Sequence, residues 1–300
     1  MLKIAFSPIY KYQLPDGHRF PMIKYELIPE QLLYEGTVSE ANFFHPEPLS
    51  EATILLTHHP DYWKKLQSQS LSRKEERAIG FPMRPDLVRR GRHIARGTLD
   101  CAHYAQRYGV AMNVAGGTHH AYPAHGEGFC VFNDIAIAAN HLLEHEGLKR
   151  ILIVDLDVHQ GNGNAYIFQN DPRVFTFSMH GAKNYPLRKE ASDLDIGLPD
   201  KTQGKAYLNI LRETLPRLLD QVQPELVFYL SGVDVLETDK LGRLSLSIEA
   251  CKQRDRMVLE LCKRHRVPLA ISMGGGYSER IAHIVEAHAN TFRMAQDLFF

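Results

Sequence analysis

An apolar stretch that ends in three ionisable residues, two positions apart, is the part of the sequence best suited to chemistry. The run 151–154 is followed by Asp155, Asp157 and His159. Because alternate side chains of an extended strand share one face, all three can point the same way. Carboxylates and an imidazole are common metal ligands, although Asp-x-Asp in this place is also typical of a turn and a helix cap. Other residues must therefore decide between the two interpretations.

Short apolar runs alternate with longer amphipathic stretches along the chain. This alternation predicts an α/β fold, a three-layer sandwich with a mostly parallel central sheet. The expected strands are 3–6, 111–115, 151–154, 174–177, 226–230 and 269–272. The expected helices are 85–108, 134–146, 203–221, 247–264 and 278–298. Residues 37–72 are expected to form loops with short helices.

Polar, titratable or glycine-rich residues follow five of these strands. Besides Asp155, Asp157 and His159, they are Gly116–His120, Ser178 with His180, Asp234, and Gly274–Tyr277. The carboxyl ends of parallel strands meet at one edge of a sheet, which is where open α/β sheets hold their ligands. We therefore expect one catalytic pocket at this edge.

The composition narrows the classes of protein that the chain can represent. With 300 residues, 44% of them hydrophobic, and no evident repeat or linker, we expect a single catalytic domain over residues 1–300. Lys and Arg balance Asp and Glu at 35 each, which gives no footprint for nucleic acid or an anionic membrane. No signal peptide or membrane-length apolar run is evident, so a cytoplasmic location is expected. The cysteines, Cys101, Cys130, Cys251 and Cys262, lack disulfide or Cys-x-x-Cys spacing and are interpreted as buried.

A catalytic zinc site needs three protein ligands and a position left for water. Asp157, His159 and Asp234 meet that requirement. Two carboxylates make the set rich in oxygen, which suits Zn²⁺ but would also accept Fe²⁺ or Mn²⁺. The sequence therefore predicts the site more firmly than the identity of its metal.

Hydrolysis of an amide also needs acid and base groups and a hydrogen-bond donor for the oxyanion. The adjacent pair His119 and His120 can supply the proton transfers. Tyr277 can supply the oxyanion donor, because a phenol stays protonated at neutral pH and the three preceding glycines free its backbone. Asp155 is more useful as the partner that orients His119 than as a ligand.

Five motifs occur in order along the chain, at residues 117–121, 128–134, 155–163, 231–234 and 274–277. Together they resemble the motif series of the zinc-dependent histone deacetylase family, which has the arginase/deacetylase fold. The resemblance runs from about His18 to the C-terminus. Gln160 and the run 277–280 make the chain most similar to the class IV branch and its bacterial relatives.

This resemblance implies roles for particular residues. Zinc would be bound by Asp157, His159 and Asp234, the tandem histidines would be His119 and His120, and Tyr277 would polarise the acyl carbonyl. A narrow tunnel for the acyl-lysine stem would be lined by Gly128, Phe129, Tyr185 and Gly275. A structural K⁺ is implied near the backbone of Asp155, Asp157, His159 and Met179 and the side chains of Asp155 and Ser178.

One position departs from the family pattern. Several members place an aspartate behind the second tandem histidine, but here the matching residue is Asn162. A neutral amide holds His120 less strongly as an imidazolium, which favours a role as general base. Asn162 is therefore interpreted as the partner of His120.

Two other groups of residues have simpler interpretations. His141 and His145 lie four apart with Glu144 between them, but the order is wrong for the His-Glu-x-x-His zinc motif, and the pair at 58–59 has no carboxylate partner at useful spacing. The segment 18–21 is either an ordinary loop or, as the resemblance implies, an arm that reaches the inner end of the pocket.

The leading hypothesis is a metal-dependent amidohydrolase that removes acetyl or longer acyl groups from lysine side chains of a protein or peptide. An acetylpolyamine amidohydrolase is the alternative within the same fold. A catalytically silent module that binds acyl-lysine is the alternative from another class. The sequence leaves the acyl length, the physiological substrate, the native metal and the oligomeric state open.

Overall fold

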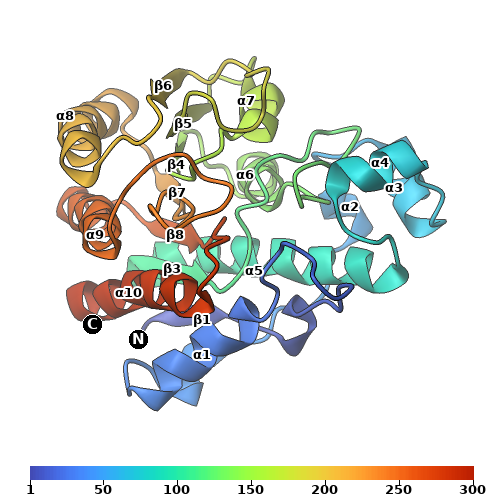
Figure 1. Cartoon of the computed structure of the whole chain (residues 1–300). Helices are drawn as coiled ribbons and strands as arrows, with labels where there is room; N and C mark the ends of the chain where they lie inside the picture. Colours follow the sequence, from blue (N-terminus) through green and yellow to red (C-terminus); the bar gives the residue numbers. More distant parts are fainter.

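The computed structural model describes residues 1–300 and contains one eight-stranded sheet in which every strand pair is parallel (Figure 1). The strand order is β2-β1-β3-β8-β7-β4-β5-β6. The strands are β1 (Lys3–Ala5), β2 (Phe43–Phe44), β3 (Val110–Asn113), β4 (Ile151–Asp155), β5 (Val174–Gly181), β6 (Leu194–Leu198), β7 (Leu226–Leu230) and β8 (Leu269–Ser272). The predicted α/β fold with a parallel sheet is confirmed.

Ten α-helices connect or cover these strands (Figure 1). They are α1 (Lys24–Tyr34), α2 (Glu51–Ile54), α3 (Pro60–Gln67), α4 (Arg73–Ile79), α5 (Pro85–Tyr108), α6 (Asp134–His145), α7 (Asn162–Phe168), α8 (Gly204–Val222), α9 (Ile248–His265) and α10 (Ile281–Phe299). Single 3₁₀ turns occur at Pro8–Tyr10 and Glu40–Asn42. Helix α5 packs on α6, and α9 packs between α8 and α10. Helices α5 and α6 connect strands that advance along the sheet toward β6, whereas α8 and α9 connect strands that return toward β3, so the right-handed rule for such crossovers assigns the two groups to opposite faces.

All six predicted strands and all five predicted helices are present, with small shifts at their ends. The largest strand difference is in β5, which continues to Gly181, so that Ser178 and His180 lie within the strand rather than after it. The largest helix difference is in α10, which begins at Ile281 because residues 274–280 form a loop around Tyr277. Strands β2 and β6 and helices α1, α4 and α7 were not predicted.

The sheet interior explains why its central strands are so apolar. Every residue of β4, β7 and β8 is buried, because helices cover both faces. A connected core of 83 buried apolar residues includes every apolar residue of these three strands. No helix has the length and apolar character needed to cross a lipid bilayer.

Strand order brings together the segments that were expected to carry chemistry. Strands β3, β8, β7, β4 and β5 are successive neighbours, so the segments after their carboxyl ends lie side by side. In register, Asp155 at the end of β4 pairs with Ser178 of β5 on one side and Leu230 of β7 on the other. The loop after Leu230 can therefore place Asp234 beside the loop that follows Asp155.

Candidate active site and metal centre

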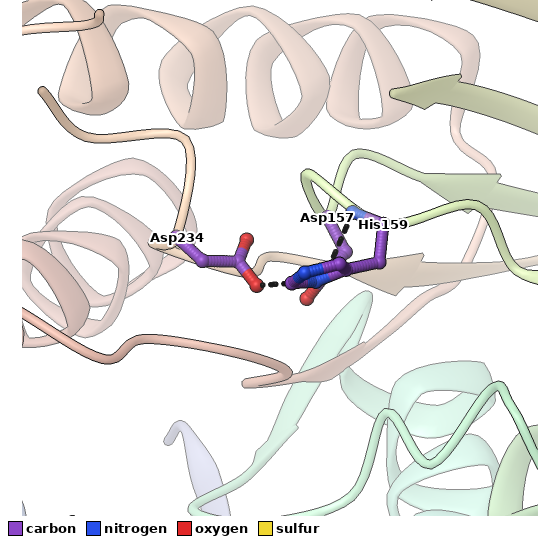
Figure 2. A group of neighbouring side chains, drawn as sticks. All are labelled: Asp157, His159 and Asp234. Carbon is purple, nitrogen blue, oxygen red and sulfur yellow. Dashed lines mark hydrogen bonds and ion pairs between the residues drawn. The ribbon is translucent and has the colours of Figure 1, made fainter. Parts of the chain in front are cut away.

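Three side chains from two neighbouring loops converge at the carboxyl edge of the sheet (Figure 2). Asp157 and His159 follow β4, and Asp234 follows β7. One donor atom from each lies within 4.8 Å of the others, and all three residues are buried. His159 Nδ1 is 3.0 Å from Asp157 Oδ1 and 3.1 Å from Asp234 Oδ2. The structure therefore brings the three predicted ligands together.

Backbone amides fix the two carboxylates. The amide of Gly275 donates to Asp157 Oδ2 at 2.8 Å, and the amide of Val158 donates to Asp234 Oδ1 at 2.9 Å. Each carboxylate therefore keeps its other oxygen directed at His159. A Cβ atom at Gly275 would collide with Asp234 Oδ2, so only glycine fits at this approach.

The electrostatics of this cluster suit a divalent cation. Burial and the nearby charge of Asp157 raise the pKa of Asp234 to about 7. Burial opposes charge on His159, but its hydrogen bonds to the two carboxylates prevail and raise its pKa to about 10. The metal-free cluster therefore retains protons that a bound cation would displace. Two carboxylates and one imidazole fit the three-ligand pattern of catalytic zinc.

His119 is held by Asp155, as the sequence predicted. Its Nδ1 donates to Asp155 Oδ2 at 2.6 Å, and the other oxygen of Asp155 accepts the amide of Asp157 at 3.1 Å. Burial disfavours the imidazolium, but the charge of Asp155 outweighs burial and raises the pKa of His119. Asp155 thus couples the position of His119 to the loop that carries the metal ligands.

His120 has a neutral partner whose orientation is fixed. Its Nδ1 donates to Asn162 Oδ1 at 2.5 Å. The amide nitrogen of Asn162 donates to Glu127 at 2.7 Å and to the Tyr122 hydroxyl at 3.1 Å, so the amide oxygen must face His120. Burial and the neighbouring His119 hold the pKa of His120 well below its usual value. His120 is therefore neutral, with a lone pair on Nε2 available to accept a proton.

Tyr277 completes the site from the loop after β8. Its amide donates to Asp239 Oδ2 at 2.6 Å, and its ring centroid lies 6.4 Å from that of His159. Phe20 and Phe129 pack against the tyrosine ring, each with a centroid 5.9 Å away. Burial raises the pKa of the Tyr277 phenol, which keeps it a hydrogen-bond donor.

Two cavities meet at these residues. The inner one has a volume of about 40 Å³ and the outer one about 480 Å³. Five residues line both and mark the passage between them: His120, Gly128, Phe129, His159 and Tyr277. Of the other predicted tunnel residues, Tyr185 lines the outer cavity and Gly275 the inner one.

The backbone conformation at the passage between the two cavities explains why residue 128 is a glycine. Gly128 has a φ of 56°, and a Cβ atom there would lie 2.6 Å from the His120 ring. The segment 18–21 divides between the cavities, since Arg19 lines the outer one and Phe20 the inner one. The position of Phe20 agrees with the expected arm that reaches the inner end of the pocket, and the segment also contributes Arg19 to the outer cavity.

Three residues that hold the site were not singled out from the sequence. Lys24 of α1 is fully buried, and its ammonium donates to the Gly274 carbonyl at 3.1 Å. Burial lowers its pKa to about 8. Asp239 holds the amide of Tyr277, and Asp134 accepts the amide and hydroxyl of Thr118 at 2.7 and 2.6 Å. None of these contacts has a local sequence signal, because each partner comes from a distant segment.

The remaining candidate residues lie outside the cluster of Asp157, His159 and Asp234. Asp155 and Ser178 are neighbours across β4 and β5, as the K⁺ prediction requires, and that ion stays a prediction. His58 lies between backbone groups, its Nδ1 3.0 Å from the Tyr122 carbonyl. His141 lies 3.5 Å from Glu146 and belongs to no metal cluster. All four cysteines are buried and free.

A parallel α/β sheet with a buried Asp-His-Asp cluster, paired histidines and a tyrosine at its carboxyl edge defines a metal-dependent hydrolase. The family model described as the histone deacetylase domain matches residues 18–292, and the chain belongs to this family. It is accordingly a hydrolase of the deacetylase class.

Curated relatives cover most of the chain. An uncharacterized protein of Picosynechococcus sp. is 43% identical over 99% of both chains. Histone deacetylase 2 of Arabidopsis thaliana is 30% identical, over 89% of this chain and 72% of its own. The acetoin utilization protein AcuC of Staphylococcus aureus is 26% identical, over 89% and 74% respectively.

Solved structures confirm the fold. The crystal structure of a histone deacetylase homolog complexed with SAHA superposes with a TM-score of 0.86 at 24% identity, over 99% of this chain and 84% of that one. The HD domain of HDA15 gives a TM-score of 0.81 at 20% identity, over 97% and 87%. At 24% and 20% sequence identity, the structural similarity supports the fold alone.

Proposed function

We propose that this protein is a zinc-dependent deacetylase that removes acetyl groups from lysine side chains of proteins or peptides. The observation that carries the proposal is the meeting of two cavities at the ligand cluster, His120 and Tyr277. This arrangement fits a substrate that reaches its scissile amide through the outer cavity and places its acyl group in the inner one. The histone deacetylase name of an Arabidopsis relative supports the same reaction.

The zinc ion would be held by Asp157, His159 and Asp234. When bound, it supplies positive charge that acidifies water and polarises the acyl carbonyl. His120 Nε2 accepts the proton of the attacking water, because its Nδ1 proton is committed to Asn162. The Tyr277 hydroxyl donates to the carbonyl oxygen as negative charge develops there.

The same histidine is placed to return the proton. His120 lines both cavities, whereas His119 lines only the inner one. The leaving amine departs through the outer cavity, so His120 faces it. Burial opposes charge on His119, but the hydrogen-bonded Asp155 raises its pKa, so His119 is better suited than His120 to carry positive charge during the reaction.

The size of the inner cavity favours a short acyl group. A volume of about 40 Å³ is room for about three water molecules. The bulky side chains of Phe20 and Tyr25 close this space. An acetyl group fits it, whereas an octanoyl or myristoyl chain would require these side chains to move. We therefore place acetyl ahead of longer acyl groups.

The test is hydrolysis of one neutral, glycine-flanked lysine peptide carrying acetyl, octanoyl or myristoyl groups. We expect the zinc-loaded protein to release amine fastest from the acetyl peptide, with activity lost to a chelator and restored by zinc. Faster turnover of a longer acyl group would contradict the assigned chain length. Tight binding without turnover, with zinc, iron or manganese loaded, would refute the enzyme and favour a binding module.

A further inference from the structure

Four cationic side chains surround the outer opening of the tunnel, and no carboxylate lines it. They are Arg19, Arg77, Lys183 and Arg243, which we call the basic rim. The four come from separate parts of the chain: the N-terminal arm, α4, the loop after β5 and the loop after β7. Because the whole chain has a net charge of zero, this concentration of one sign is a local property of the opening.

The rim charges are largely unneutralised. Arg19, Arg77 and Lys183 are exposed and form no ion pair, and only Arg243 has a carboxylate partner, Asp200 at 3.2 Å. The guanidinium of Arg19 lies over the Phe129 ring instead, 4.9 Å from its centroid. Unpaired like charges around one opening raise the local concentration of anions and repel cations.

Acidic residues that adjoin the lining residues in sequence or by contact do not themselves line the outer cavity. Glu127 accepts the side-chain amide of Asn162 at 2.7 Å. Asp239 accepts the amides of Leu241 and Gly242, each at 2.8 Å, and that of Tyr277. Glu76, the chain neighbour of Arg77, does not line the cavity. The lining of the outer cavity therefore contains four cationic side chains and no carboxylate.

Apolar side chains stand beside these charges. Leu187 is 92% exposed and Tyr185 is 39% exposed, and both line the outer cavity. Exposed apolar surface next to unpaired cations suits a peptide, which offers backbone and side chains to pack, better than a small inorganic anion.

On the basis of the proposed deacetylase function, we propose that the basic rim selects acetyl-lysines flanked by aspartate or glutamate in acidic peptide segments. Flanking carboxylates would pair with Arg19, Arg77 and Lys183 while the acetyl-lysine stem occupies the tunnel. The same charges disfavour lysine- and arginine-rich tails. They also disfavour acetylated polyamines, whose free amines would meet four cations at the opening.

The experiment compares kcat/KM for three peptides in which acetyl-lysine has two aspartates, two glycines or two arginines on each side. At low salt we expect the acidic peptide to exceed the basic one by about tenfold or more, with the neutral peptide between them. The ratio should fall toward about twofold at about 0.5 M NaCl, because exposed pairs are screened. Equal rates, or faster turnover of the basic peptide, would overturn the proposal.

Charge reversal on the protein provides the matching test. The double variant Arg77→Glu with Lys183→Glu changes two exposed side chains that have no ion-pair partner, so its fold should persist. We expect the order of the acidic and basic peptides to invert. The control is Arg217→Glu, an exposed residue in the second half of α8, which approaches the opposite edge of the sheet. An unchanged ratio in the double variant, or an equal change in the control, would contradict the rim's role.

A binding measurement separates this proposal from the deacetylase function itself. The same three peptides, with a zinc-binding hydroxamate in place of the acetyl amide, bind whether or not turnover occurs. If no acetyl peptide is hydrolysed but the acidic hydroxamate binds about tenfold more tightly than the basic one, the proposed reaction fails and the rim's selectivity stands. Equal affinities for the three would refute the rim's selectivity. Tighter binding of a small anionic hydroxamate than of the acidic peptide would refute the peptide assignment.

Discussion

Replacement of Arg254 should weaken both the fold and the metal centre, although this residue touches no predicted ligand side chain. Arg254 lies in α9 and is fully buried. Its guanidinium donates to the carbonyls of Leu156, Gly232 and Ser231, at 3.1, 2.6 and 3.3 Å. These carbonyls belong to the loops that carry Asp157 and Asp234. One side chain therefore joins the two loops that hold the metal ligands.

The expected loss of unfolding free energy follows from the buried groups that would lose Arg254 as their partner. Arg254 also pairs with Asp255 at 2.7 Å, and both side chains are completely buried. The variant Arg254→Met would leave this buried carboxylate without a counter-charge, bonded only to the Tyr229 and Thr291 hydroxyls, and would remove the donor from three carbonyls. Together these losses should cost about 3–5 kcal/mol of unfolding free energy. Because Arg254 would no longer join the two loops that carry the ligands, zinc binding should also weaken by about 10- to 100-fold. Arg254→Lys keeps the charge without the planar fork, and a smaller loss is expected.

The assays are urea unfolding of the metal-free proteins and zinc titration against a competing chelator. Arg256→Met is the matched control, because Arg256 lies two residues along the same helix with its side chain 57% exposed. We expect the control to stay within about 0.5 kcal/mol of the parent. If Arg254→Met does not fold, Arg254→Lys supplies the measurement. Parent-like stability and zinc affinity in the folded Arg254 variant would refute the reasoning.

Three further predictions concern the chemistry of the site. Tyr277→Phe should lower kcat by about a hundredfold or more while zinc affinity stays within about twofold, and parent-like turnover would rule out the oxyanion role. Asn162→Asp places a carboxylate beside His120 and raises its pKa, so the acidic limb of the kcat/KM profile should move to higher pH by about one unit or more; an unmoved limb would contradict a neutral His120. Because the carboxylates raise the pKa of metal-free His159 to about 10, zinc binding at pH 7 should release at least about one proton and tighten about tenfold per pH unit. Calorimetry in buffers of different ionisation enthalpy measures that release, and its absence would contradict the assigned protonation.

The sequence predicted the parts of the site that depend on strand geometry. Asp157 and His159 alternate along one extended segment, so their common direction follows from local backbone geometry. Asp234 and Tyr277 follow other apolar runs. They come close to Asp157 and His159 because parallel strands place their carboxyl ends at the same edge of the sheet. The pairing of His120 with Asn162 came from a family pattern rather than from spacing.

The missed elements lacked the usual local signals. Strand β6 is an edge strand with the sequence Leu-Asp-Ile-Gly-Leu, and only its last residue is buried, so its apolar pattern is weak. Helix α1 contains Pro29, and strand β2 has only two residues. Lys24, in turn, is separated by 250 positions from the carbonyl that it binds. Tertiary packing alone determines such contacts.

Two fully buried cations that the sequence analysis missed, Lys24 and Arg254, share one feature that bears on metal binding. Lys24 donates to the Gly274 carbonyl, and Arg254 donates to the carbonyls of the ligand loops. The charges of Asp234 and Asp157 partly offset the effect of burial on Lys24, which places its ammonium within their field. Yet neither cation takes up an oxygen of Asp157 or Asp234. Positive charge is thus held near the ligand loops, while the inward oxygens of Asp157 and Asp234 are bonded only to His159, whose proton a divalent ion would displace.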